Sequence, residues 1–256
     1  MSIEQPSKSS EIDNKRVSRQ EVYAQISQSI RLNGTEISLV ILSTVIAAIG
    51  LLKDSQVVII GAMVIAPLLQ PNMALAIATT FGDLSLAIRT VRVGLTQIAI
   101  ALSLSIFFGI LVPVNLDMKE IGARTSVNFA DLVLAFASGI AGAISLTVGE
   151  QSAVVGVMVS VALLPPLVVL GMLIGSQLWR AATETAVLVS ANIVCLNLAA
   201  IATFWLQDIR PQQWWQKFQA KKITRIALIF WLIILVLLIG IVFMYQFDKS
   251  LSELIV

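Results

Sequence analysis

Histidine is absent from this sequence, and cysteine occurs only once, at Cys195. Without histidine the chain can build no histidine-ligated metal site, no Ser-His triad and no histidine proton relay. A single cysteine cannot form a disulfide within the chain, and its position in an apolar run is typical of a small buried hydrophobic side chain. The sequence also lacks a Gly-x-Ser-x-Gly motif and paired carboxylates within its apolar runs. We therefore expect no enzyme site, no metal and no cofactor.

Charged residues are scarce as well. They form 12% of the chain, against roughly 25% in soluble domains, whereas hydrophobic residues form 57%. Mean hydropathy is +0.91. Most side chains must therefore lie against lipid or against other buried helices. The net charge of +2 is too small to indicate a nucleic-acid partner.

Long apolar runs fill most of the chain. Seven of them follow one another, at residues 37–52, 57–79, 91–114, 130–148, 153–174, 186–206 and 226–247. A membrane-spanning helix needs about 20 apolar residues, and main-chain groups in lipid must bond within their own segment, so these runs are predicted to be helices. The predicted fold is an all-α, polytopic integral membrane protein with about seven transmembrane helices. The lipid bilayer is therefore one expected partner of the chain.

Four parts are expected along the chain. They are an N-terminal cytoplasmic segment with an amphipathic helix at residues 1–35, a membrane domain at residues 36–206, a basic, Trp-rich cytoplasmic loop at residues 207–225, and a seventh transmembrane helix with a short tail at residues 226–256. In the first part Val22, Ile26 and Ile30 recur four residues apart, which predicts the amphipathic helix. Either this helix lies on the membrane surface or it packs against the bundle.

Lysine and arginine are unevenly shared between the two sides of the predicted bundle. The N-terminal segment and the connections on its side carry 12 of the 17 basic residues, and the opposite side carries 5. The positive-inside rule therefore predicts a cytoplasmic N-terminus. With seven spans, the C-terminus would lie outside.

An internal repeat is visible at an offset of 95 residues. GAMVIAPLLQP at residues 61–71 aligns with GVMVSVALLPP at residues 156–166, with six of the eleven positions identical. Residues 36–114 and 129–206 would then be two copies of a three-helix unit. Because three is odd, the second copy enters the membrane from the opposite side, which predicts an inverted repeat of the kind found in secondary transporters. The alternative is that hydrophobic helices with similar packing needs match without duplication.

Each copy carries two prolines near the centre of its second helix. Proline lacks an N–H, so the main-chain oxygens of Met63, Pro67, Val161 and Ala162, each four residues before a proline, lose their helical donor. In lipid, a main-chain oxygen without a hydrogen bond costs free energy unless water, a substrate or another group donates to it. We therefore predict a break in each helix, with Asn72 capping the half-helix after the first. The alternative is a pair of kinks that serve packing.

Small and polar residues mark predicted helix contacts. Ala135, Gly139 and Ala143 are spaced by four, as are Gly171 and Gly175, and this spacing predicts close approach of helices within the chain or between subunits. Asn192 and Asn197 lie inside the sixth apolar run. Interhelical hydrogen bonds are the simplest interpretation of these two amides.

A family resemblance rests on several of these stretches. They are GAMVIAPLLQP at residues 61–71, Gly82-Asp83-Leu84, Ala-Arg-Thr-Ser at residues 123–126 with Asn128 and Asp131, Ser138-Gly139, and ALLPP at residues 162–166. Over roughly residues 55–201 the chain resembles the prokaryotic "uncharacterised hydrophobic domain" family, catalogued as domain of unknown function 389. The resemblance implies a bacterial or archaeal membrane protein. It supplies no substrate and no catalytic residue. The localisation that we expect is the prokaryotic plasma (inner) membrane.

The inverted repeat with its matched prolines favours a transporter or channel for a small solute or ion. The predicted pathway residues are Met63, Pro67, Gln70, Pro71, Asn72, Ser160, Val161, Ala162, Pro165 and Pro166. An alternative is a non-transporting scaffold, assembly factor or stress sensor that works through the basic segment at residues 207–225. The small-residue stripes would also suit a homo-oligomer.

Overall fold

The computed structural model describes residues 19–148, 153–209 and 222–241, and at residues 19–20, 25 and 153–161 it describes the main chain alone. In these ranges every regular element is a helix and no strand occurs, so the all-α prediction is confirmed. The helices are α2 (Arg19–Ser29), α3 (Gly34–Leu52), α4 (Gln56–Ile65), α5 (Leu69–Phe81), α6 (Leu84–Leu111), α7 (Lys119–Gly122), α8 (Phe129–Val148), α9 (Ala153–Gly175) and α10 (Trp179–Leu206). A further helix, Lys222–Ile241, is called the C-terminal helix below.

Five of the described helices are long and apolar enough to cross a membrane: α3, α6, α8, α10 and the C-terminal helix. The bent pair of α4 and α5 would be a sixth span if its halves count as one. α9 is helical over 23 residues, so each of the seven apolar runs carries helix. The number of seven spans stays a prediction, because length and composition alone do not decide which helices cross.

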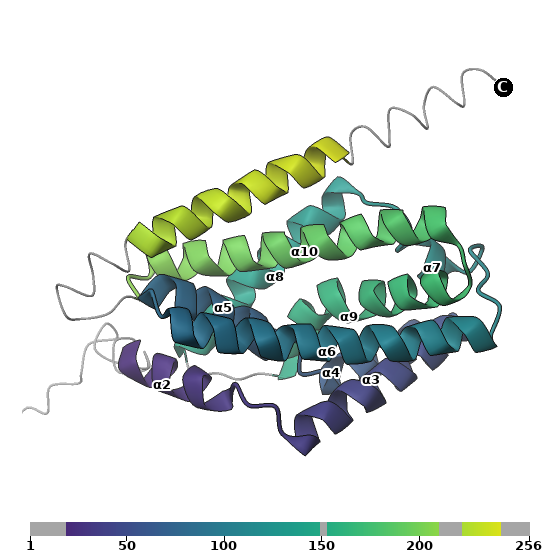
Figure 1. Ribbon diagram of the computed structural model, residues 1–256, viewed down its shortest axis with the longest axis horizontal. Helices are drawn as coiled ribbons and strands as arrows, with labels where there is room; N and C mark the ends of the chain where they lie inside the picture. Colours follow the sequence, from purple (N-terminus) through teal and green to yellow (C-terminus); the bar gives the residue numbers. More distant parts are fainter. Residues whose placement is uncertain (1–18, 149–152, 210–221, 242–256) are drawn as a thin grey trace, which may run out of the picture.

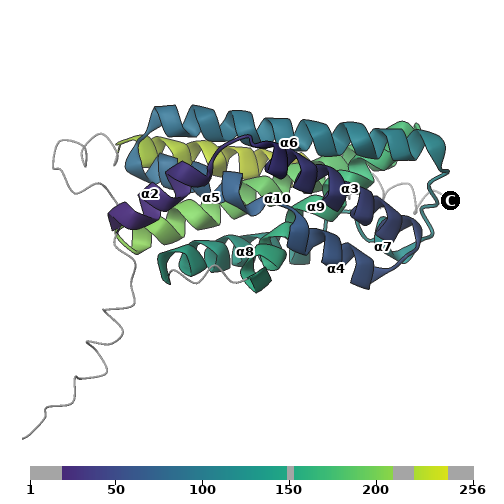
Figure 2. The ribbon, with the colours of Figure 1, turned by 90° about the horizontal axis from the view of Figure 1, so that it is seen from below.

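Two long helices, α6 and α10, lie along the long axis of the molecule and run in opposite directions, with α9 between them (Figure 1). α8 covers α10 on the side away from α6 (Figure 2). In both views α2 and the α5–α6 corner lie at one end of the long axis, and α7 lies at the other. The C-terminal helix runs lengthwise beside α10 (Figure 1).

Helix boundaries recur at the same offset of 95 residues as the sequence repeat. α3 and α8 begin 95 residues apart, and both ends of α6 and α10 are also 95 residues apart. The turns before α6 and α10 match too, because Gly82 and Gln177 both have left-handed main chains, with φ of 70° and 59°. The first and third helices of residues 36–114 and 129–206 therefore correspond in their boundaries, while the second helices do not.

The helix predicted near the N-terminus is α2, and it packs against the bundle. Val22, Ile26 and Ile30 are all buried in the main hydrophobic core. α2 contacts α5 and α8. Of the two alternatives left open by the sequence, the structure therefore selects the packing helix.

The predicted break in the first half is confirmed between α4 and α5, whose axes differ by 50°. Ala66 has an extended main chain, with ψ of 122°, because the ring of Pro67 clashes with a helical residue before it. Pro71 lies in the first turn of α5, where a missing N–H loses no helical bond. Asn72 does not cap α5, contrary to the prediction. Its Nδ2 instead donates to the main-chain oxygen of Leu68 at 2.8 Å.

The predicted break in the second half is wrong, because α9 is helical through Pro165 and Pro166. Pro166 leaves the main-chain oxygen of Ala162 without a helical donor. Asn192 of α10 supplies one, since its Nδ2 donates to that oxygen at 2.7 Å. α9 also packs against α4, α6, α8 and α10. A continuous helix is therefore tolerated where a neighbouring helix satisfies the freed oxygen.

Glycines allow two close helix contacts within the chain. A Cβ on Gly109 of α6 would overlap the main chain of α9, and a Cβ on Gly171 or Gly175 of α9 would overlap α6. Gly139 of α8 faces α10 in the same way. The small-residue stripes predicted from the sequence are thus confirmed as contacts within the chain.

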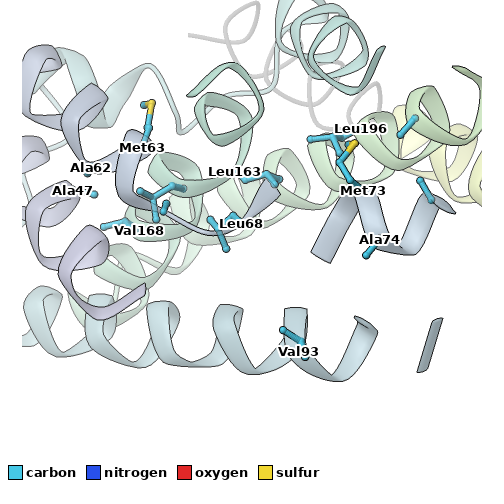
Figure 3. Close-up of a cluster of buried hydrophobic side chains, with 14 of the residues drawn as sticks. Ala47, Ala62, Met63, Leu68, Met73, Ala74, Val93, Leu163, Val168 and Leu196 are labelled. Atoms are coloured by element: carbon cyan, nitrogen blue, oxygen red, sulfur yellow. The ribbon is translucent and has the colours of Figure 1, made fainter. Parts of the chain in front are cut away.

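The broken helix is held against α9 by the main hydrophobic core. Met63 of α4 and Leu68 at the break belong to one buried cluster with Leu163 and Val168 of α9 (Figure 3). Met73 of α5 and Leu196 of α10 belong to the same cluster. Close packing of this kind fixes where the two halves of the broken helix lie.

Candidate functional site

A cavity of about 240 Å³ lies between α5, α6, α9 and α10, and the C-terminal helix forms a further wall. Its lining residues are Leu68, Pro71, Asn72, Leu75, Thr90, Val91, Gly94, Leu95, Gln97, Ile98, Leu163, Leu167, Val189, Ile193, Asn197 and Trp231. The break between α4 and α5 thus opens directly beside the cavity. No described residue of the lining carries a formal charge.

The cavity reaches the middle of both long helices. Gln97 is the fourteenth of the 28 residues of α6, and Ile193 is the fifteenth of the 28 residues of α10. At 1.5 Å per residue, Gln97 lies roughly 20 Å from either end of its helix. For helices that cross a bilayer lengthwise, this depth is the midplane.

Several polar side-chain atoms of the residues that line the cavity have no hydrogen-bond partner among the described residues. Gln97 is 2% exposed, and neither its Oε1 nor its Nε2 has a hydrogen bond among the described residues. The same holds for the Oγ1 of Thr90, which is 1% exposed and lies two helical turns before Gln97. Buried polar groups without partners are rare in native structures and call for an explanation, such as an unseen water or ligand.

A pair of asparagines connects the two halves of the molecule at the cavity. Asn197 Nδ2 of α10 donates to Asn72 Oδ1 of α5 at 3.0 Å, and also to the main-chain oxygen of Ile193 at 2.9 Å. The Oδ1 of Asn197 has no partner among the described residues. Among the described lining residues, Gln97 therefore keeps both its donors and its acceptor unused, and Asn197 keeps its acceptor.

The lining follows the internal repeat. Four pairs of lining residues are 95 positions apart: Leu68 and Leu163, Asn72 and Leu167, Gly94 and Val189, and Ile98 and Ile193. Each pair takes one residue from each half of the membrane domain. The cavity is thus bounded by corresponding positions of the two halves.

Two of the ten predicted pathway residues, Pro71 and Asn72, line this cavity. Gln70 is exposed instead. The remaining described side chains are buried in helix packing outside the lining, at Met63, Pro67, Ala162, Pro165 and Pro166. The side chains of Ser160 and Val161 lie outside the described residues. The structure therefore brings α9 to the cavity through Leu163 and Leu167 rather than through its prolines.

Sequence reasoning missed the polar residues on α6. Gln97 is the sole amide of the apolar run at residues 91–114, and a search at the repeat offset would have paired it with Asn192. Thr90 pairs with Thr185 in the same way, and all four side chains are buried. Trp231 gave no such signal, because the C-terminal helix lies outside the repeat.

The corner where α5 turns into α6 is fastened to α2. Asp83 caps α6 by accepting from the N–H of Leu86 at 3.0 Å, and the hydroxyl of Tyr23 donates to the same carboxylate. The Tyr23 ring also packs on Phe81, with ring centroids 4.8 Å apart. Burial and the Asp83 carboxylate raise the pKa of Tyr23 to about 12. Burial acts to raise the pKa of Asp83, but its hydrogen bonds from Tyr23 and Leu86 hold that pKa below its ordinary value.

One of the comparisons with known proteins identifies a family. The family model described as Domain of unknown function (DUF389) matches residues 63–198, which include every wall of the cavity except the C-terminal helix. "Uncharacterized protein MJ0678" of the archaeon Methanocaldococcus jannaschii is 36% identical over 216 residues, which cover 84% of this chain and 68% of that protein. No solved structure matches the chain. The resemblance seen in the sequence is thereby confirmed, and the chain belongs to the DUF389 family of membrane proteins.

Proposed function

We propose that this protein moves a small solute or ion across a prokaryotic plasma membrane through the cavity between α5, α6, α9 and α10. The observation that carries the proposal is the lining itself, in which four pairs of residues stand 95 positions apart. Transporters built from inverted repeats hold their substrates at the interface of the repeats, near the bilayer midplane. No covalent chemistry is part of the proposal.

An inverted repeat is part of the same proposal. α6 and α10 run in opposite directions along the long axis (Figure 1). The third helix of each half packs on the second helix of the other half, since α6 contacts α9 and α10 contacts α5. A two-fold axis in the membrane plane would relate the halves in this way. Seven spans with a cytoplasmic N-terminus and an external C-terminus complete this topology.

The broken helix supports a pathway for a second reason. The main-chain oxygen of Met63 lies four residues before Pro67, and Pro67 has no N–H to donate to it. Irregular backbone at membrane depth is tolerated where it lies in protein or lines a cavity. Discontinuous helices of this kind form the binding sites of many secondary transporters.

A cysteine-accessibility scan tests the proposal. In a Cys195→Ala background, Ile98→Cys and Ile193→Cys place single thiols at a matched pair of lining positions. Phe107→Cys, at a side chain 55% exposed on α6, is the control for a surface in contact with lipid. We expect a membrane-impermeant thiol reagent to label both lining positions but not the control. Complete protection of both lining positions would favour the scaffold, assembly-factor or stress-sensor alternative.

A further inference from the structure

We infer that the cavity takes an uncharged molecule with an apolar body and a group that both donates and accepts hydrogen bonds, and that the Gln97 amide is its principal polar contact. This inference rests on the proposed function and narrows it from any small solute or ion to one chemical class. The carrying observation is an amide buried to 98% whose two polar atoms have no partner in the described structure and which lines the cavity.

At the position that matches Gln97 in the second half of the molecule, the side chain hydrogen-bonds to a main-chain oxygen of a neighbouring helix, and Gln97 makes no such bond to any described residue. Asn192, 95 positions later, donates to the main-chain oxygen of Ala162 at 2.7 Å. The corresponding oxygen in the first half belongs to Pro67, and the Nε2 of Gln97 makes no bond to it or to any other described atom. The helix break moves the Pro67 region away from the geometry of a continuous helix. The amide of Gln97 is thereby left to a ligand.

The lining argues against an ion. No described residue of the lining is charged, and the two cations nearest along α6, Arg89 and Arg92, have exposed side chains and do not line the cavity. An ion that enters an apolar cavity loses its hydration and finds no opposite charge to replace it. A neutral molecule loses much less. A carboxamide side chain presents one acceptor and two donors, so it matches a neutral group of mixed character best.

The remaining walls fit an apolar body. Aliphatic side chains of α5, α6, α9 and α10 and the ring of Trp231 surround the polar atoms. Val91 and Leu95 line the cavity and are also 42% and 60% exposed, so the cavity reaches the outer surface of the bundle. A dry engineered cavity of about 150 Å³ holds benzene, so about 240 Å³ is sufficient for a substituted benzene.

Three probes of one size separate the classes: benzamide, benzoate and benzylammonium. The full chain is reconstituted in phosphatidylcholine vesicles with Trp231 as its one tryptophan. The other four tryptophans, Trp179, Trp205, Trp214 and Trp215, are replaced by phenylalanine. Because Trp231 lines the cavity, its fluorescence reports a ligand bound there. We expect saturable binding of benzamide and none of benzoate or benzylammonium.

Two variants decide whether Gln97 is the contact. Gln97→Leu should weaken benzamide binding about tenfold, which corresponds to the loss of about one hydrogen bond. Ser105→Ala removes a hydroxyl that is buried on the same helix outside the cavity and bonded to Ala101, so it should leave binding unchanged. Equal binding by Gln97→Leu and wild type would overturn the role of Gln97.

The binding experiment tests the class of solute, and the thiol-labelling experiment tests transport, so the two results can differ. Binding of benzoate or benzylammonium as tightly as benzamide, or no binding of any probe, overturns the inference on solute class. Labelling of Ile98→Cys and Ile193→Cys would then still support a pathway. Conversely, benzamide binding together with complete protection of both thiols supports the inference and overturns transport, leaving a closed binding site.

Discussion

The second helices of the two halves share a sequence pattern but differ in structure. In the first half the chain bends by 50° between α4 and α5, next to Pro67, whereas α9 continues through Pro165 and Pro166. The helices packed around α9 account for the difference. The oxygen freed by Pro166 receives a hydrogen bond from Asn192, and α9 packs against α3, α4, α5, α6, α8 and α10.

The two halves also differ in the hydrogen bonding of a buried amide, Gln97 in the first half, which lines the cavity, and Asn192 in the second. Gln97 stands where Asn192 stands in the other half, but it donates to nothing among the described residues. Asn192 thus bonds to the main chain of α9, whereas the amide of Gln97, a residue of the cavity lining, stays without a partner among the described residues. At Ala162 the oxygen freed by a proline receives a donor from a neighbouring helix, and the helix continues there.

The largest effect is expected where α9 is most tightly enclosed. Gly109→Ala would place a Cβ on the main-chain oxygen of Met172, and since neither main chain can yield without moving a helix, we expect a loss of about 3 kcal/mol in the free energy of unfolding. Gly61→Ala on α4, where a Cβ meets nothing within 4 Å, is the matched control. It should be neutral or gain up to about 1 kcal/mol. Chemical unfolding in detergent micelles measures both. Equal losses would show that α9 is held no more tightly than α4.

The next effect compares the two matched amides. Asn192→Leu leaves the buried oxygen of Ala162 without a donor and should cost about 2 kcal/mol of unfolding free energy. Gln97→Leu removes an amide that has no described partner, so it should be neutral or stabilising. Unfolding of the two variants side by side measures the difference. A Gln97→Leu variant as unstable as Asn192→Leu would mean that Gln97 serves packing.

A double-mutant cycle sharpens this result. Pro166→Ala gives the oxygen of Ala162 a helical donor of its own, so Asn192→Leu should cost less in that background than in the wild type. An unchanged cost would show that Asn192 stabilises α9 by packing alone.

A smaller effect is expected at the end of α5. Tyr23→Phe removes the hydrogen bond to Asp83 but keeps the ring contact with Phe81, so it should cost about 1 kcal/mol. The pKa of Tyr23, raised to about 12, means that the folded state holds the phenolic proton more tightly than the unfolded chain does. This contribution is complete below about pH 10 and is lost as the pH rises through about 12. Unfolding measured against pH should show the decline in wild type and a weaker one in Tyr23→Phe.

The smallest effect on stability is expected at the asparagine pair. Asn72→Leu removes the acceptor of Asn197 and the Asn72 donor to the oxygen of Leu68. Asn197 keeps its bond to the oxygen of Ile193, so the interhelical part of the loss should be about 0.6 kcal/mol, typical of interhelical bonds in membranes. Binding of benzamide should fall by more than stability does, because an amide of the lining is lost. A variant with unchanged binding would place Asn72 outside the contact surface.

Several features were decided by the sequence alone. Composition determined a helical membrane protein, because main-chain groups in lipid must be satisfied within their own segment. Glycine spacing predicted that the stripes on α8 and α9 make close helix contacts, since a missing Cβ permits close approach whatever the partner, and the structure shows α10 and α6 as those partners. The extended main chain at Ala66 also followed from Pro67 alone.

The tertiary structure decided which proline helix breaks and which amide stays unpaired. Asn192 reaches Ala162 over 30 residues, and Asn197 reaches Asn72 over 125. No local pattern contains such partners, because a freed oxygen or a buried amide is satisfied by whichever helix packs beside it. The sequence therefore predicted a break in both helices, of which only the one at Pro67 occurs, and it identified two lining residues, Pro71 and Asn72. It did not reveal the cavity, whose lining residue Gln97 lacks, among the described residues, a bond of the kind that Asn192 makes 95 positions later.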